Sequence, residues 1–202
     1  NNIYKHLYHD LKMSHVMQVA NHANFGSSRF LVIKMKSVET KEVWKTLEAV
    51  AKYSPSSSKV VIAVNEDINP WDAEVINWAI SFRVQPHRDC RIHTYTPKSF
   101  MDYSLMPPQG RDDLNLRYEH LPDASLLFIN ATMKWPYPPV SLPKREFMQE
   151  ALQLWQEERL PALKLKEPWW GYNLGAWSAE EEELAAMATR GEYYRSGEII
   201  AQ

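Results

Sequence analysis

Four short segments of the chain have the hydrophobic patterns of β-strands. Residues 29–36 (RFLVIKMK) place three apolar side chains on one face and two lysines on the other, which is typical of a half-buried strand. Residues 59–64 (KVVIAV) lack alternation and are rich in β-branched side chains, as central parallel strands covered on both faces are. Residues 124–129 predict a further buried strand, and residues 89–94 predict a shorter one.

Helical patterns alternate with these strands. Thr40 is expected to cap a helix that runs to Tyr53, because apolar residues recur there every three to four positions. Asn69 and Pro70 have the residue types of an N-cap and a first helical position, so a second helix is expected to start there. Its buried stripe is expected at Val75, Trp78, Ala79 and Phe82.

The last part of the chain changes character. A helix is expected over residues 143–159, and an aromatic linker follows at Trp169 to Tyr172. Ser178 and Glu181 have the spacing of a capping box, which predicts a last helix from Ala179 to about Thr189. An aromatic segment with little core of its own is usually buried against another domain or subunit.

The order of these elements predicts an α/β fold. We expect a mostly parallel central sheet with helices on both faces over residues 1–159. We expect a C-terminal helical and aromatic extension over residues 160–202, packed on another domain or subunit.

The charge balance narrows the range of partners. The 202 residues carry 23 basic and 25 acidic side chains, a formal net charge of −2. This balance argues against a nucleic-acid partner or an anionic membrane, since both favour a basic excess. No apolar run is long enough to cross a bilayer, no signal peptide opens the chain, and Cys90 is the one cysteine. We therefore expect a cytoplasmic protein.

An acidic turn follows the central strand and is the first candidate for chemistry. Glu66 and Asp67 could bind a metal ion or act as an acid/base pair, but adjacent carboxylates point in different directions. We favour turn and capping contacts near a helix N-terminus, where negative charge is stabilised. The seven histidines lack the paired spacing of a helical zinc site, and Cys90 lies in a predicted strand, where an inert thiol is expected.

Other catalytic signatures are absent from the sequence. There is no G-x-S-x-G elbow, no P-loop and no G-x-G-x-x-G motif. The long loop at residues 96–112 carries apolar and aromatic side chains beside Asp102. It could form the wall of a pocket or fold onto the core of the domain, and the residues alone leave both interpretations open.

Two motifs resemble the UbiD-type decarboxylases, a family that uses prenylated flavin mononucleotide. Residues 60–89 (VVIAVNEDINPWDAEVINWAISFRVQPHRD) are similar to the family pattern V-D-x-D-I-D-P…W-A-x-x-x-R…D. Residues 128–136 (FINATMKWP) are similar to I-D-A-T-x-K-W-P. Asn69 and Asn130 stand where the family usually has Asp.

The resemblance implies that the chain is the C-terminal α/β domain of a larger enzyme. The catalytic residues, the flavin, a divalent metal ion and K+ would then lie outside this chain, which is expected to contribute no catalytic, cofactor-binding or metal-binding residue. Leu105 to Pro108 resembles the family element that follows the pocket side chains. This similarity assigns substrate-binding roles to Tyr103 and Leu105, and also to Ile62 on the central strand.

The implied activity is reversible, non-oxidative decarboxylation of aromatic or α,β-unsaturated carboxylic acids. The chain would supply oligomer contacts and one wall of the substrate pocket, and its partners would be the flavin-binding domain of the same enzyme and further copies, as a dimer or hexamer. By itself it is expected to be inactive. The alternative is a non-catalytic oligomerisation or interaction module.

Overall fold

The structure is a computed structural model that describes residues 2–22, 29–96, 104–105, 123–135, 145–163 and 179–192. Its contacts divide the chain into two units, Asn1–Trp135 and Pro136–Gln202, which are described separately below. The domain boundary expected at residue 159 stays a prediction.

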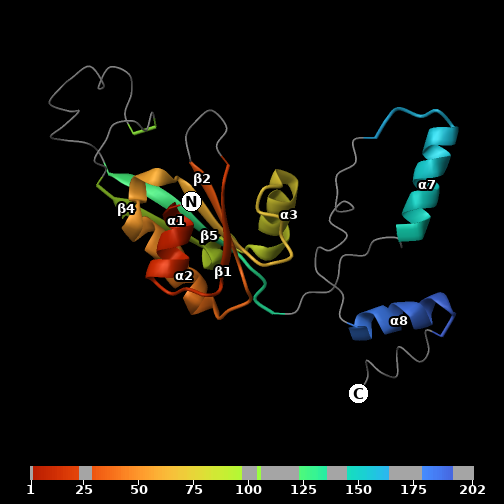
Figure 1. The fold of residues 1–202 in the computed structure, drawn as a ribbon, viewed down its shortest axis with the longest axis horizontal. Coiled ribbons are helices and arrows are strands. Elements are labelled where there is room, and N and C mark those ends of the chain that lie inside the picture. The colour runs from red at the N-terminus through yellow and green to blue at the C-terminus, as the bar shows by residue number, and fades with distance from the viewer. Residues whose placement is uncertain are drawn as a thin grey trace. The chain divides into compact units, whose positions relative to one another are not determined.

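The first unit is built on a five-stranded mixed sheet (Figure 1). The three central strands are parallel to each other, and the strand at each edge is antiparallel to its neighbour. All four strands expected from the sequence are present, and the apolar run at residues 59–64 is the middle strand. In spatial order the strands are β1 (Val16–Asn21), β2 (Phe30–Met35), β3 (Val60–Val64), β5 (Ala124–Ala131) and β4 (Cys90–Tyr95).

One face of the sheet packs against α2 (Thr40–Tyr53) and the N-terminal helical segments α1 (Asn2–Tyr4) and η1 (Lys5–Asp10). Leu31, Ile33 and Met35 point to this side, as predicted, and are fully buried. Burial of each such side chain contributes roughly 1.5–3 kcal/mol. The α2 helix runs to Tyr53 as expected, but Thr40 is its first helical residue, and Glu39 holds the cap position without a side-chain hydrogen bond.

The other face of the sheet is covered by α3 (Ala73–Arg83). Strand alternation points Val32, Ile62 and Ile129 away from α2, and these three side chains are aligned across β2, β3 and β5. Ile76 and Ala79 of α3 are also buried but lie outside the core cluster of the α2 face, and α3 contacts β5. Helices therefore cover both faces, as the sequence predicts.

The start and orientation of α3 differ from the sequence prediction. Asp72 caps the helix, because its carboxylate accepts the N–H groups of Glu74 and Val75. Asn69 instead closes the preceding turn by accepting the N–H of Trp71 at 3.1 Å. The buried residues of the helix are Ile76, Ala79 and Arg83, whereas Val75 and Trp78 are partly exposed and Phe82 is exposed.

The segment between β3 and α3 crosses the sheet. It leaves the carboxyl end of β3 and reaches His22, which follows β1 near the amino end of β2. His22 Nε2 donates to the carbonyl oxygen of Pro70 at 2.6 Å, and its ring stacks near Trp71. Ile68, which belongs to this segment, is fully buried. The chain then returns along α3 to the carboxyl edge of the sheet.

Short helices complete the first unit, and two longer helices are described in the second. In the first unit η3 (Pro55–Ser57) follows α2, and α4 (Pro86–Asp89) leads into β4. In the second unit α7 (Arg145–Glu157) and α8 (Ala179–Thr189) occupy the predicted helical regions. Ser178 of the expected capping box and the linker Trp169–Tyr172 lie outside the described residues, so the packing of the extension stays a prediction. Among the helices that the structure describes, none is long and apolar enough to span a membrane.

A histidine joins the N-terminal segment to α2. The Thr46 hydroxyl donates a hydrogen bond to the carbonyl oxygen of Glu42 at 2.8 Å. Its oxygen therefore accepts a hydrogen bond from His15 Nε2, also at 2.8 Å. Thr46 is fully buried. Burial lowers the pKa of His15, and the nearby Glu42 only partly opposes this effect. The fold therefore favours neutral His15.

This shift predicts a loss of stability on mild acidification. The unfolded chain binds the His15 proton more tightly, so the stability is complete above the ordinary pKa of 6.5 and falls as the pH drops below it. Urea unfolding at pH 7.5 and 5.5 should show a smaller pH effect for His15→Gln than for the parent chain. His87→Gln, at an exposed position, is the matched control. An unchanged pH effect in His15→Gln would contradict the assignment.

Candidate functional site

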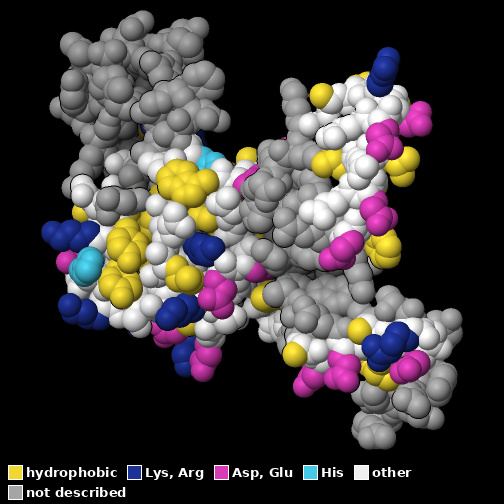
Figure 2. Space-filling model, turned by 45° about the vertical axis from the view of Figure 1, so that its right-hand side comes forward, with side chains coloured by type: hydrophobic (Ala, Val, Ile, Leu, Met, Phe, Trp, Pro, Cys, Tyr) yellow, Lys and Arg dark blue, Asp and Glu magenta, His cyan; other side chains and the backbone are white. Residues whose placement is uncertain are grey.

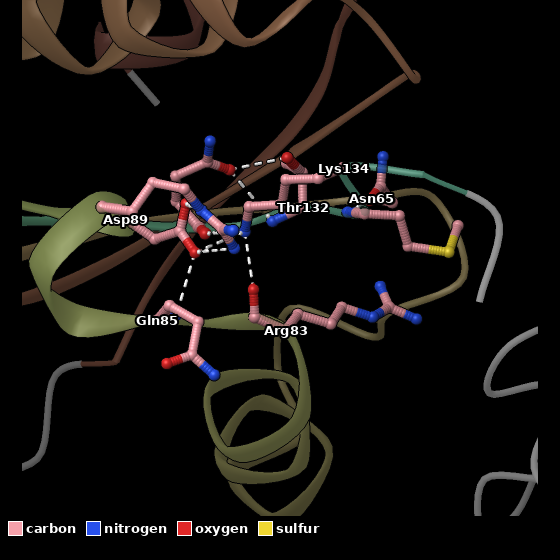
Figure 3. A network of polar contacts seen from close by, with 9 residues as sticks. Asn65, Arg83, Gln85, Asp89, Thr132 and Lys134 are labelled. Atoms are coloured by element: carbon pink, nitrogen blue, oxygen red, sulfur yellow. Dashed lines mark hydrogen bonds and ion pairs between the residues drawn. The ribbon is translucent and has the colours of Figure 1, made fainter.

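Buried polar side chains gather at the carboxyl edge of the sheet, where β3 and β5 end (Figure 3). Parallel strands end at the same edge, which is where α/β proteins usually place their functional groups. Asn65 follows β3, Asn130 lies near the end of β5, and Thr132 follows β5. All three are buried, which makes their hydrogen bonds decisive for the local fold.

The asparagines close the two strand ends. Asn65 Oδ1 accepts the backbone N–H of Met133 at 2.6 Å, a bond between residues 68 positions apart. Asn130 Oδ1 accepts the N–H of Thr132 at 3.1 Å and its hydroxyl at 2.6 Å. The Nδ2 group of Asn130 is buried and has no hydrogen-bond partner. The amide oxygens therefore hold the backbone that leaves β5 against the end of β3.

Lys134 lies at the centre of the network, with only 7% of its side chain exposed. Its Nζ donates to the carbonyl oxygens of Arg83 and Asn130, both at 2.6 Å, and lies 3.4 Å from Asp89 Oδ2. Burial lowers the pKa of Lys134, and Asp89 opposes that effect. One ammonium group thus joins the end of α3, the end of β5 and the residue before β4.

Asp89 is buried but is compensated on several sides. Its carboxylate accepts the N–H of Gln85 at 2.8 Å and two N–H groups of Arg88, at 3.1 and 2.8 Å. Burial alone would raise the pKa of Asp89, but Arg88, Gln85 and Lys134 together lower it below its ordinary value. Arg88 in turn lies over the ring of Trp135, 5.2 Å from its centroid. Asp89 is therefore held as a carboxylate.

A second ion pair fixes the acidic turn. Arg83 Nη1 donates to Asp67 Oδ1 at 3.1 Å, and Nη2 donates to Asp67 Oδ2. The Arg83 side chain is fully buried and its guanidinium also lies over Trp78, 5.1 Å from the ring centroid. The cap of α3 is Asp72, and Asp67 pairs with Arg83. Glu66 is exposed.

The network is built to hold backbone segments rather than to exchange protons. Both carboxylates are paired with arginines, and the lysine is saturated by two carbonyl oxygens and Asp89. In the described part of the chain, no group of three His, Cys, Asp or Glu side chains could hold a metal ion. Burial, followed by the charge of Asp89, raises the pKa of the half-buried Cys90 thiol, which keeps it protonated and unreactive.

The residues assigned to a substrate pocket are placed in part. Ile62 is fully buried on β3, on the face opposite α2. Leu105 is half-buried, and its neighbour Ser104 accepts a hydrogen bond from Lys59 Nζ. Tyr103 and most of the loop at residues 96–112 lie outside the described residues. Their substrate-binding roles stay predictions.

Sequence reasoning missed the network as a unit. Most of its members belong to the two motifs quoted above, but their spacing along the chain gives no sign that they meet. The bond from Lys134 to Arg83, for example, joins residues 51 positions apart. The one local signal in the sequence is the position of Lys134 soon after a predicted buried strand. A lysine at such a position needs partners, because an unpaired ammonium group is rarely buried.

The ion pair in the acidic turn can be tested by changing neighbouring carboxylates. Asp67→Asn leaves the buried Arg83 guanidinium uncompensated and should lower the free energy of unfolding by about 3 kcal/mol. Glu66→Gln, at the adjacent exposed position, should change it by less than about 0.5 kcal/mol. Equal effects of the two substitutions in urea unfolding would contradict this account.

Lys134 can be tested in the same way. Lys134→Met removes the donor to two carbonyl oxygens and one of the cationic partners of Asp89, and should lower the free energy of unfolding by about 3 kcal/mol. Lys36→Met removes an exposed lysine and serves as the control. If chemical denaturation gives the same midpoint for both variants, Lys134 does not hold the network together.

Comparison with known proteins identifies the family. Residues 3–115 match the family described as the 3-octaprenyl-4-hydroxybenzoate carboxy-lyase C-terminal domain (UbiD_C). This range is more than half of the 202 residues and contains Asp67, Arg83 and Asp89 of the network.

Solved structures share the fold. The vanillic acid decarboxylase of Sedimentibacter hydroxybenzoicus in closed form covers 77% of this chain and 31% of its own, with 20% identity and a TM-score of 0.56. The UbiD-class enzyme HmfF from Pelotomaculum thermopropionicum, in complex with FMN, covers 68% of this chain and 29% of its own, with 23% identity and a TM-score of 0.51. The apo 3,4-dihydroxybenzoic acid decarboxylase (AroY) of Klebsiella pneumoniae covers 73% of this chain and 31% of its own, with 18% identity and a TM-score of 0.51.

The similarity to these solved structures is limited in identity and in length. At 18–23% identity they show a shared fold, and the chain spans less than a third of the length of each of these solved chains. The family match and the shared fold agree with the motifs that meet at the carboxyl edge of the sheet. The chain therefore belongs to the UbiD C-terminal domain family.

Proposed function

We propose that this chain is the C-terminal domain of a reversible, non-oxidative decarboxylase of aromatic or α,β-unsaturated carboxylic acids. The observation that carries the proposal is the family match over residues 3–115. The shared fold with decarboxylases of vanillic acid and 3,4-dihydroxybenzoic acid supports the chemical class of substrate.

The cofactor of the proposed enzyme is prenylated FMN with a divalent metal ion and K+. The complex of HmfF with FMN supports a flavin in the complete enzyme. The described residues do not fit a metal site, since they hold no suitable group of three ligands and the network carboxylates are paired with arginines. In this proposal the flavin and its ions are bound by a part of the enzyme outside this chain. The bound flavin would accept electron density as carbon dioxide leaves.

In this proposal the chain contributes one wall of the substrate pocket and the oligomer contacts. Tyr103 would donate a hydrogen bond to a phenolic or carboxylate oxygen of the substrate, and Leu105 would pack on its ring. Ile62 is buried on the central strand, so its effect on substrate would pass through the segments that cover it. The network at the carboxyl edge would keep this wall rigid when the domain closes over the flavin-binding part and excludes water.

The pocket role is testable in the full-length enzyme. Tyr103→Phe and Leu105→Ala should lower kcat/KM for vanillic or 3,4-dihydroxybenzoic acid roughly ten-fold, the effect of about 1.4 kcal/mol of lost transition-state binding. Carbon dioxide release measures the rate, and light scattering checks that the oligomer mass is unchanged. Unchanged rates and substrate range would remove the pocket role.

A second measurement tests the assignment of the chemistry to another part of the enzyme. The purified chain, mixed with prenylated FMN and the same acids, should release no carbon dioxide and should not bind flavin tightly. Turnover or tight flavin binding would overturn the proposal.

A further inference from the structure

Lys59 connects the central strand to the segment that carries Leu105. Figure 2 shows basic side chains at the surface of the first unit among acidic and hydrophobic ones, and most lysines in proteins have such an exposed position. Lys59 differs, because it is half-buried and its Nζ donates a hydrogen bond to the Ser104 hydroxyl, 45 positions away. A bond between residues so far apart in the chain restrains a loop relative to the sheet.

The backbone of Lys59 is fixed between two neighbouring strands. Its N–H donates to the carbonyl oxygen of Arg29 at 2.8 Å, and its own carbonyl oxygen accepts the N–H of Leu127 at 2.8 Å. Arg29 directly precedes β2, and Leu127 lies in β5. The side chain of Lys59 therefore starts from a rigid point at the amino end of β3, held from both sides.

The acceptor of the bond belongs to the segment that we assign to the substrate pocket. Ser104 is exposed, and it directly precedes the half-buried Leu105. Because consecutive Cα atoms are only about 3.8 Å apart, a restraint on Ser104 also limits where Leu105 can lie. Ile62, the other pocket residue that the structure describes, lies three positions beyond Lys59 on β3. One strand thus carries Ile62 and, through Lys59, holds Leu105.

The chemistry of the bond suits a local restraint. An ammonium group makes a stronger hydrogen bond to a hydroxyl oxygen than a neutral donor does. Binding residues on loops need a rigid scaffold to fix their positions, and a central strand is such a scaffold. A single bond near the surface adds little to the stability of the whole domain. Its loss should therefore change the position of Leu105 more than it changes the unfolding of the chain.

We propose that Lys59 is a positioning residue of the substrate pocket, which sets the place of Leu105 against the substrate ring through Ser104. Lys59 itself touches neither substrate nor flavin in this arrangement. A displaced Leu105 packs less well on the bound acid and on the transition state alike, so the loss appears in KM rather than in kcat. The inference rests on the proposed function for the meaning of the pocket, but its first test does not depend on decarboxylation.

The first experiment follows Leu105 in the 202-residue chain by methyl NMR, with its signals assigned by their loss in Leu105→Ala. Lys59→Met should move the Leu105 methyl shifts at least halfway toward those of an unfolded leucine, because the restraint is lost. Lys59→Arg keeps a cationic donor and should restore most of the parent shifts. Lys36→Met, at an exposed position just after β2, is the matched control and should leave Leu105 unchanged. Unchanged signals of the buried Leu31 show that the core is intact in each variant.

The second experiment measures KM and kcat of the full-length enzyme with the aromatic acids named above. Lys59→Met should raise KM about five-fold, the effect expected of one hydrogen bond, and should change kcat by less than about two-fold. Ser104→Ala should raise KM by a similar factor, and the double variant by no more than either single one, because both changes remove the same bond. A residue that only stabilised the fold would lower the amount of active enzyme and leave KM unchanged.

The outcomes separate this inference from the proposed function. Parent-like Leu105 signals in Lys59→Met, an unchanged KM, or additive effects of Lys59→Met and Ser104→Ala would overturn the positioning role. If the parent enzyme releases no carbon dioxide although the Leu105 signals shift in Lys59→Met, the proposed function fails and the restraint of Leu105 by Lys59 stands.

Discussion

The buried ammonium group of Lys134 is the interaction on which the carboxyl edge of this domain depends. It donates to carbonyl oxygens at the end of α3 and in β5, and it lies beside the carboxylate of Asp89. The end of α3 is distant from β5 in sequence, since Arg83 and Lys134 lie 51 positions apart, and the shared donor joins the two segments beside Asp89. Because a buried charge is costly unless it is compensated on all sides, the group specifies one arrangement of these segments.

The position of α3 follows from this constraint and from the Arg83–Asp67 pair. Both interactions hold the carboxyl end of the helix, whereas Asp72 and the bond from His22 to Pro70 determine where its amino end begins. The helix therefore has little freedom to rotate. Its orientation buries Ile76 and Ala79 on the side of the sheet. Trp78 remains partly exposed and Phe82 remains exposed on the surface of the domain.

The family to which the chain belongs gives this architecture a functional setting. The chain spans less than a third of the length of the related solved chains, and a pocket wall and contacts between subunits are the roles that we propose for it. In the proposed function, the network at the carboxyl edge would preserve the shape of a surface that closes over a substrate.

The sequence by itself determined the local elements and the family. Periodicity predicted α2, and an unbroken run of β-branched residues predicted the central strand β3, because burial on one or on two faces leaves its pattern in neighbouring residues. The two motifs indicated the family without showing what their residues do. It could not determine which stripe of α3 meets the sheet, since Ile76 and Phe82 are equally apolar choices. It also could not bring Asn65 to Met133 or Lys134 to Arg83. Only the tertiary structure decided these points, because such contacts depend on strand order and on the path of the segments between strands.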